Sequence, residues 1–260
     1  MELGIAGRRA IVCASSQGLG LACATALSRE GVDVVINGRS EEKLEGARAT
    51  IIASGGVGDV RFVAADITTE AGRAALIAAC PEADILINNN AGPAPGSIED
   101  WDHDAWVQAL EANMIAPLLL IRALLPGMCA RRFGRIVNIT SAMVKAPRYG
   151  MALSTGARAG LTAASKAISR EVAECNVTIN NLLPERIDTP RQHFMAKKLV
   201  KEQGITVEAA RAQIAASIAA KRFGTPDEFG AACAFLCGAT SGFISGQNLQ
   251  LDGGSYPGLV

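Results

Sequence analysis

A glycine-containing turn near the start of the chain has the composition of a phosphate-binding site. It spans residues 13–20, follows a short apolar run at 9–13 and precedes a segment of helical period. Gly18 and Gly20 would let the backbone approach a pyrophosphate, and the N-terminus of the following helix would offer free N–H groups to it. The turn therefore predicts dinucleotide binding, although a tight turn without a ligand has the same composition. The predicted contacts are Ser15, Ser16, Gln17, Gly18, Leu19 and Gly20.

The end of the next apolar run predicts which dinucleotide binds. An Asp or Glu there would bond the ribose 2′-hydroxyl of NAD and repel a 2′-phosphate, but neither occurs between Val34 and Ser40. Arg39 stands in this stretch and offers a planar fork of donors suited to phosphate. The sequence thus predicts NADP(H), and a solvated arginine on a loop is the alternative.

The cysteines and histidines do not follow a metal-binding pattern. The chain has 7 Cys and 2 His, and most of the cysteines are flanked by apolar residues, as is typical of buried thiols in a reducing compartment. Cys233 and Cys237 are spaced to share a helix face, but a metal site needs further ligands nearby. His103 and His193 lack partners at ligand spacing. No metal is expected.

Length and charge favour one α/β domain that binds a small molecule. The chain has 260 residues, 49% of them hydrophobic, with 25 basic and 25 acidic residues. This balance gives no sign of a nucleic-acid or membrane surface. The apolar run at 115–121 is too short to span a bilayer. Because no signal-peptide pattern opens the chain, we expect a cytoplasmic protein.

The order of the predicted elements indicates a doubly wound parallel sheet. Short runs that are apolar on both faces alternate with segments of helical period, such as 19–30 and 104–125. We expect one Rossmann-type domain over residues 1–260, with helices on both faces of the sheet and a ligand crevice at the carboxyl ends of the first strands. Residues 189–222 are polar and then helical, and are predicted to form a flap over this crevice. The predicted strands are 9–13, 33–37, 59–64, 85–88, 135–139, 177–180 and 248–251.

Several further motifs resemble those of the short-chain dehydrogenase/reductase family, and they occur in the family's order. They lie at 66–67, 89–92, 222–228 and 244–254, so the resemblance covers nearly the whole chain. One departure is Ala14, which stands where the family's glycine turn begins. The resemblance is to 3-oxoacyl carrier-protein reductases and related dehydrogenases. It implies further cofactor contacts at Asp66, Ile67, Asn90, Ala91, Gly92, Pro184 and Thr189.

The same resemblance implies a catalytic set, but two members are replaced. Asn113 matches the family's water-holding asparagine and Ser141 its carbonyl-polarising serine. The family's tyrosine and lysine align without a gap to Ser154 and Arg158, and a gapped alignment gives Met151 and Thr155 instead. A serine hydroxyl is a much weaker acid than a tyrosine with a cation beside it. Arg158 would keep the positive charge and the ribose contact without releasing a proton.

Two tyrosines and one carboxylate are candidates to compensate for these losses. Tyr149 lies on the loop after Ser141, near Lys145, and is the best substitute proton donor; a pocket wall is the alternative. Tyr256 lies in the C-terminal tail, a segment that is a candidate to cross a subunit interface. Glu185 stands where the family has glycine, with Arg186 as its obvious partner, and a surface ion pair is the alternative.

The sequence therefore predicts an atypical NADP(H)-dependent oxidoreductase acting on a carbonyl or alcohol. Two other functions remain open: non-redox chemistry in the same pocket, and a regulatory protein that binds nicotinamide without turning it over. The family's interfaces imply a homotetramer or homodimer. The substrate is expected to be a small molecule that the sequence does not identify.

Overall fold

The computed structural model describes residues 2–259, which contain a seven-stranded parallel sheet. The strand order is β3-β2-β1-β4-β5-β6-β7, so the winding direction reverses between β1 and β4. Every residue of β4 and β5 is buried, because helices cover both faces of the sheet. The predicted parallel sheet is thereby confirmed. The strands are β1 (Arg9–Val12), β2 (Asp33–Gly38), β3 (Val60–Ala64), β4 (Ile85–Asn88), β5 (Gly134–Ile139), β6 (Val177–Pro184) and β7 (Asn248–Leu251).

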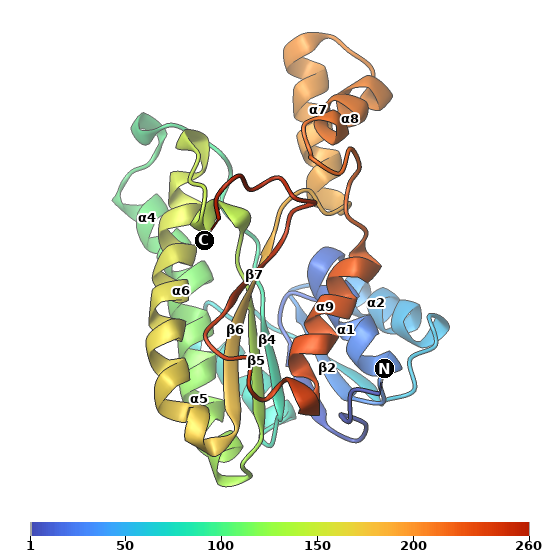
Figure 1. The fold of residues 1–260 in the computed structure, drawn as a ribbon, viewed down its shortest axis with the longest axis vertical. Coiled ribbons are helices and arrows are strands. Elements are labelled where there is room, and N and C mark those ends of the chain that lie inside the picture. The colour runs from blue at the N-terminus through green and yellow to red at the C-terminus, as the bar shows by residue number, and fades with distance from the viewer. Residues whose placement is uncertain (1, 260) are drawn as a thin grey trace.

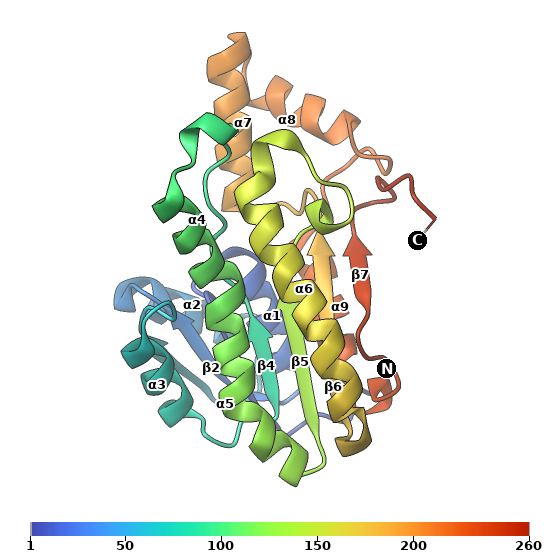
Figure 2. The ribbon, with the colours of Figure 1, turned by 90° about the vertical axis from the view of Figure 1, so that its left-hand side faces the viewer.

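The helices form one layer on each face of the sheet (Figure 1). One layer consists of α1 (Gly18–Arg29), α2 (Glu41–Ala53) and α9 (Pro226–Cys237). The other consists of α3 (Glu70–Ala79), α4 (His103–Leu110), α5 (Ala116–Ala130) and α6 (Ala152–Val172), as Figure 2 shows from the side. The reversal of strand order places a crevice at the carboxyl ends of β1 and β4.

One long helical stretch, 103–130, joins α4 to α5 through a π-helical turn at Glu111–Ile115. By length and composition this stretch could cross a membrane. In the structure Leu120, Ile121 and Leu124 are buried in the core between the sheet and this helix layer. These three apolar side chains of the stretch therefore serve the packing of the domain.

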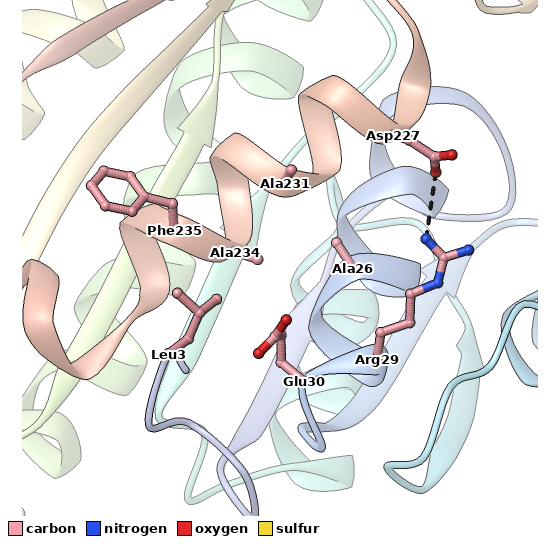
Figure 3. Close-up of a pocket in the computed structure, with 8 residues that line it drawn as sticks. All are labelled: Leu3, Ala26, Arg29, Glu30, Asp227, Ala231, Ala234 and Phe235. Atoms are coloured by element: carbon pink, nitrogen blue, oxygen red, sulfur yellow. Dashed lines mark ion pairs between the residues drawn. The ribbon is translucent and has the colours of Figure 1, made fainter. Parts of the chain in front are cut away.

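Helices α1 and α9 approach each other closely on the opposite face. A Cβ atom at Gly230 would lie 2.6 Å from the carbonyl oxygen of Ala22, so only glycine permits this approach. A shallow pocket of about 310 Å³ opens where the helices diverge, and an Arg29–Asp227 ion pair of 3.6 Å spans it (Figure 3). Among residues 2–259, the lining of this pocket includes none of the residues predicted to bind the cofactor.

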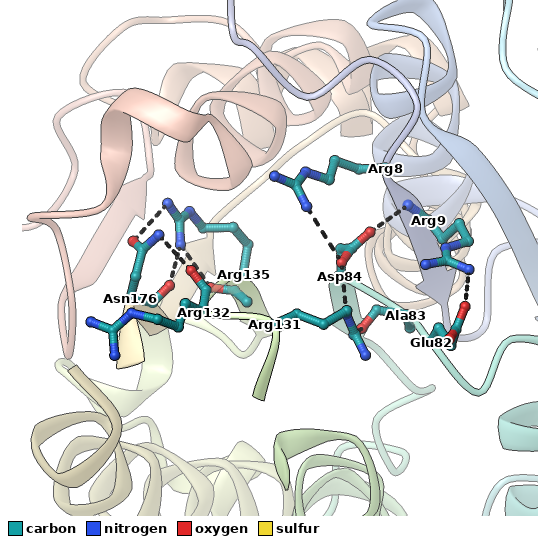
Figure 4. Close-up of polar contacts among 10 residues, drawn as sticks. Arg8, Arg9, Glu82, Ala83, Asp84, Arg131, Arg132, Arg135 and Asn176 are labelled. Carbon is teal, nitrogen blue, oxygen red and sulfur yellow. Dashed lines mark hydrogen bonds and ion pairs between the residues drawn. The ribbon is translucent and has the colours of Figure 1, made fainter. Parts of the chain in front are cut away.

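A fully buried arginine, Arg135, joins three elements at the amino end of the sheet (Figure 4). Its Nε donates to the carbonyl oxygen of Gly238, directly after α9, at 3.1 Å, and its Nη1 donates to the carbonyl oxygen of Asn176 at 2.9 Å. The guanidinium also lies over the ring of Phe133, with its Cζ 4.4 Å from the centroid. Arg135 thus uses the partial negative charge at the end of α9 to hold that helix on the sheet.

A row of asparagines, three of them buried, crosses the sheet from the end of β4 to the start of β7. Asn88 donates to Asn138 at 2.9 Å, Asn138 donates to Asn181 at 3.0 Å, and Asn181 donates to Asn248 at 2.8 Å. Asn138 also donates to Ser165 on α6 at 2.9 Å. These residues pair in register across β4, β5, β6 and β7. The row therefore favours one strand register, because a slip would leave buried amides unbonded.

Residues of the predicted flap form two helices, α7 (Pro190–Gln203) and α8 (Val207–Ala216), which stand above the carboxyl end of the sheet (Figures 1 and 2). They share a small core of their own around Ala196, Ala210 and Ile214. An isolated β-bridge between Ile187 and Gly224 joins the segment that enters this helix pair to the segment that leaves it.

Candidate cofactor and substrate site

A cavity of about 1000 Å³ lies at the carboxyl ends of the strands, at the position where the strand order reverses. It brings together the glycine turn, the tip of β2, the loop after β5, the start of α6 and the segment before α7. Most of the residues predicted from the sequence line it. They are Ser16, Gln17, Gly18, Leu19, Arg39, Asp66, Ile67, Asn90, Ala91, Gly92, Ser141, Ser154, Arg158, Pro184 and Thr189.

Two predicted contacts, Ser15 and Gly20, support the turn from behind and are absent from the described cavity lining. The Ser15 hydroxyl is buried, donates to the carbonyl of Val12 at 2.7 Å and accepts from the backbone N–H of Asn37 at 2.9 Å. A Cβ atom at Gly20 would lie 2.5 Å from the carbonyl oxygen of Ala14. Gly20 is therefore required by the turn itself.

Ala14 adopts φ +43°, the left-handed conformation that glycine tolerates best. A glycine at this position would adopt the same conformation without strain, whereas the alanine adopts it at a cost in free energy. Asn89 stabilises the turn by donating to the carbonyl of Ala14 at 3.0 Å.

The turn has the features that a pyrophosphate site needs. Gly18 adopts φ +60°, and a Cβ atom there would lie 3.8 Å from Thr189, so the turn and the flap base face each other. Gln17 makes no side-chain cap bond to α1 within the described chain, which leaves the helix N-terminus available to an anion. These features make the N-terminus of α1 the candidate anion site of the cavity.

Arg39 and Asp66 lie beside each other at the ends of β2 and β3. Arg39 is exposed at the rim of the cavity. The N–H and hydroxyl of Thr68 lower the pKa of Asp66, and the charge of Arg39 adds a smaller effect in the same direction. Asn37 fixes the two strand ends by donating to the carbonyls of Val63 and Ala65 at 3.1 and 3.0 Å.

Ser154 and Arg158 are both buried and bonded to each other on α6. Arg158 Nε donates to Ser154 Oγ at 3.2 Å. Its Nη1 donates to the carbonyls of Ile139 and Thr140 at 2.6 and 3.1 Å, and its Nη2 donates to the carbonyl of Asn90 at 3.1 Å. Most of the guanidinium's donors are thus directed at the ends of β4 and β5 rather than into the cavity.

The environment of Arg158 contains no carboxylate within salt-bridge distance among residues 2–259. Burial lowers the pKa of its guanidinium to about 10, and the like charge of Arg191 contributes to the shift. Arg158 therefore stays charged at neutral pH and supplies a positive potential at the floor of the cavity.

Asn113 and Ser141 occupy different positions relative to the cavity. Asn113 lies in the π-helical turn, where its Nδ2 donates to the carbonyls of Ala91 and Ala109, both at 3.4 Å. Its buried Oδ1 has no partner within the described chain, and its neighbour Ala112 reaches the cavity lining. Ser141 lines the cavity directly, and its Oγ accepts from the N–H of Met143 at 3.2 Å.

The two tyrosines lie outside the described cavity lining. The Tyr149 side chain is 70% exposed, and its hydroxyl contributes, after Ser97, to lowering the pKa of Glu99. Tyr256 packs against the loop after Ser141, with Lys145 Nζ 5.5 Å from its ring centroid. The structure thus does not bring Tyr149 to the serines.

Glu185 enters the cavity wall with two arginines beside it. Its carboxylate lies 3.3 Å from Arg186 Nε and 3.5 Å from Arg148 Nη1, and its side chain is only 10% exposed. The partner expected from the sequence, Arg186, is present. Arg148 was missed, because it comes from a loop 37 positions away and no local spacing connects it to Glu185.

A doubly wound sheet with a cavity at the point where the strand order reverses is typical of nicotinamide-dependent reductases. Comparison with known proteins gives the family. The family model described as enoyl-(acyl carrier protein) reductase matches residues 13–256. The chain is 32% identical to the NADPH-dependent reductase BacG of Bacillus subtilis, over 97% of this chain and 99% of that protein. It is 30% identical to the 3-oxoacyl-[acyl-carrier-protein] reductase FabG of Vibrio cholerae, over 98% and 99%.

Among solved structures, L-sorbose reductase from Gluconobacter frateurii, in complex with NADPH and L-sorbose, superposes with a TM-score of 0.94. The two chains are 30% identical, and all of each chain is covered. This chain belongs to the short-chain dehydrogenase/reductase family. The names of BacG and of the L-sorbose reductase complex include NADPH, in agreement with the cofactor predicted from Arg39.

Proposed function

We propose that the protein is an atypical NADP(H)-dependent oxidoreductase that transfers hydride between the nicotinamide and a carbonyl or alcohol substrate. One observation carries the proposal: Ser141, Ser154 and Arg158 line the same cavity as Gly18 and Arg39. A dinucleotide bound along the turn would therefore end beside two hydroxyls and a buried cation.

The residues along the cavity fit the parts of NADP(H) in order. Arg39 would hold the 2′-phosphate, and the turn at Gly18 with the N-terminus of α1 would hold the pyrophosphate. When bound, the cofactor supplies or accepts the hydride. The remaining predicted contacts are Asp66 and Ile67 for adenine, and Asn90, Ala91, Gly92, Pro184 and Thr189 for the nicotinamide half.

The chemistry of the protein side differs from that of the family because no phenol stands at position 154. Ser141 and Ser154 would donate hydrogen bonds to the substrate oxygen, and the potential of Arg158 would stabilise negative charge on it. The proton would come from water, since neither serine nor arginine is an effective acid at neutral pH. The side-chain amide of Asn113 would help keep the π-helical turn open beside such a water.

The test is NADPH binding followed by turnover with a panel of aldehydes and ketones, and with NADP⁺ and alcohols in the reverse direction. Binding with consumption of NADPH by at least one carbonyl supports the proposal. Failure to bind either NADPH or NADP⁺ would contradict it.

A nicotinamide-binding regulatory protein is the second candidate, and the arrangement of Arg158 favours it. A guanidinium that bonds the carbonyls of Asn90, Ile139 and Thr140 has fewer donors left for a ribose or a reacting oxygen. Tight binding of NADPH with no turnover across the panel would select this function. Conversion of a substrate without change in the nicotinamide absorbance would select non-redox chemistry.

We also propose a cytoplasmic homodimer or homotetramer, in which residues 189–222 form the flap over the substrate. Exposed apolar side chains on the last helix and strand and the loop between them support an interface there: Phe235, Phe243 and Leu249. Light scattering that gives only the 26.9 kDa monomer would contradict the assembly.

A further inference from the structure

The Arg148–Glu185–Arg186 cluster stands at the end of the cavity where the substrate of the proposed reaction would lie. All three residues line the cavity; Arg148 lies on the loop that follows Ser141, and Glu185 and Arg186 follow Pro184 at the end of β6. Glu185 is nearly buried and is contacted by both guanidinium groups, whereas the Arg148 side chain is 57% exposed. One carboxylate between two arginines leaves one positive charge without a counter-charge in the cluster.

The other cations of the cavity already have assignable roles. Arg39 faces the 2′-phosphate position, and Arg158 is bonded to backbone carbonyls. Arg191 lies over the ring of Phe194, with its Cζ 5.7 Å from the centroid, and its charge acts on Arg158. The uncompensated charge of the cluster is therefore not needed by the cofactor.

The backbone at Arg186 supports a recognition role. Arg186 adopts φ +55°, a left-handed conformation that a long side chain adopts only at a cost in free energy. Its Nη1 lies 3.4 Å from Oε1 of Gln192, another cavity residue, so the guanidinium is held between Glu185 and the start of α7. A strained arginine fixed on two sides is a preorganised anion contact.

The surfaces around the cluster are apolar. Met143, Met151, Phe194 and Met195 line the cavity too, on the loop that carries Arg148 and on the first turns of α7 beside Gln192. Flexible methionine side chains fit hydrocarbon groups of different shape. This end of the site thus combines a cationic anchor with an adaptable apolar wall.

We propose that Arg148 and Arg186 form a carboxylate-binding subsite, and that the substrates are oxo- or hydroxy-acids with a small hydrocarbon body. The proposal rests on the function proposed above. A single uncompensated charge matches a monoanionic carboxylate better than a phosphate dianion. Glu185 acts as a positioning residue that holds the two guanidinium groups together.

The experiment measures binding separately from turnover. Protein saturated with NADP⁺ is titrated calorimetrically with short oxo-acids of increasing chain length, and with the primary amide of each acid. At least one acid should bind tenfold or more tightly than its amide. Arg148→Gln and Arg186→Gln should each reduce that preference about tenfold, as expected for loss of a charge-assisted hydrogen bond, while the amide and NADP⁺ affinities stay within about twofold.

Arg170→Gln provides the matched control, because Arg170 is an exposed arginine of α6 outside the cavity. Equal affinity for every acid and its amide, no binding of any acid, or unchanged preference in both cluster variants would overturn the subsite. Tighter binding of inorganic phosphate than of any acid would also overturn it. Acid preference without hydride transfer would count against the proposed reaction alone, and hydride transfer to neutral ketones without acid preference would count against the subsite alone.

Discussion

Arg158 donates from Nε to the hydroxyl of Ser154 over 3.2 Å, one turn earlier on α6. Ser154 and Arg158, which we align with the family's tyrosine and lysine, are thus a bonded pair, and the remaining bonded donors of Arg158 reach backbone carbonyls. Gly92 faces this pair: a Cβ atom there would lie 3.4 Å from Ser154 Oγ and 3.6 Å from Arg158 Nη2. The pair is buried and ordered by the fold before any ligand binds.

Replacing both members of this pair should restore a proton relay. Ser154 lines the cavity, so a tyrosine at this position can extend into it. The double variant Ser154→Tyr/Arg158→Lys should raise reduction of simple ketones by about 10² or more, the range of general acid catalysis. Each single variant should do less, because the lysine acts through the tyrosine. Rates of NADPH oxidation measure this, and a double variant no faster than wild type would contradict it.

Arg158→Ala should destabilise the fold as well as weaken the site. It leaves the carbonyls of Asn90, Ile139 and Thr140 buried without their donor, which should cost about 3 kcal/mol of the free energy of unfolding. In a chain of this size, that corresponds to a fall of Tm of about 6–12 °C. Thermal melts with and without NADPH separate this loss from a weakened ribose contact. Unchanged Tm would show that the three bonds do not stabilise the native state.

Arg39→Ala should lower the affinity for NADPH about tenfold to a hundredfold, because a charge-assisted contact to the 2′-phosphate is worth about 1.5–3 kcal/mol. Affinity for NADH should change little, since NADH lacks that phosphate. Fluorescence titration of both cofactors gives the comparison, with Arg170→Ala as the control. Equal losses for the two cofactors would assign Arg39 a scaffold role.

Tyr149→Phe and Ser141→Ala should differ sharply once a substrate is known. The Tyr149 side chain is 70% exposed and outside the described cavity lining, so its hydroxyl should be dispensable and kcat should stay within about twofold. Ser141→Ala removes a donor to the substrate oxygen and should lower kcat by about 10². A large loss in Tyr149→Phe with NADPH still bound would instead make Tyr149 the substitute donor.

Asn138→Ala should be among the most destabilising changes in the sheet. It leaves buried partners on Asn88, Asn181 and Ser165 unbonded, at a cost of about 3 kcal/mol. Asn248→Ala, at the partly exposed end of the row, removes one bond and should cost about 1 kcal/mol. Denaturant unfolding of the two variants gives the comparison. Equal effects would mean that the row contributes through each strand pair separately.

The architecture could be predicted because it depends on local patterns that repeat. The runs at 85–88 and 248–251 coincide with β4 and β7, and the other predicted strands overlap the observed ones with differences at their ends. The helix predicted at 104–125 extends over 103–130 in the structure, and it contains a π-helical turn at Glu111–Ile115. One extra residue in a single turn barely changes the spacing of apolar residues, so the sequence pattern did not predict the π-helical turn.

The sequence by itself determined the parallel sheet, the glycine turn and the position of Arg39, since each follows from residues close together in the chain. The tertiary structure alone decided the destinations of long or buried side chains. Arg158 bonds carbonyls of β5 and of the loop after β4, Ser15 turns inward to Asn37, and Arg148 reaches Glu185. Their partners come from distant strands and loops, so their contacts form only when the sheet has assembled those segments at one edge.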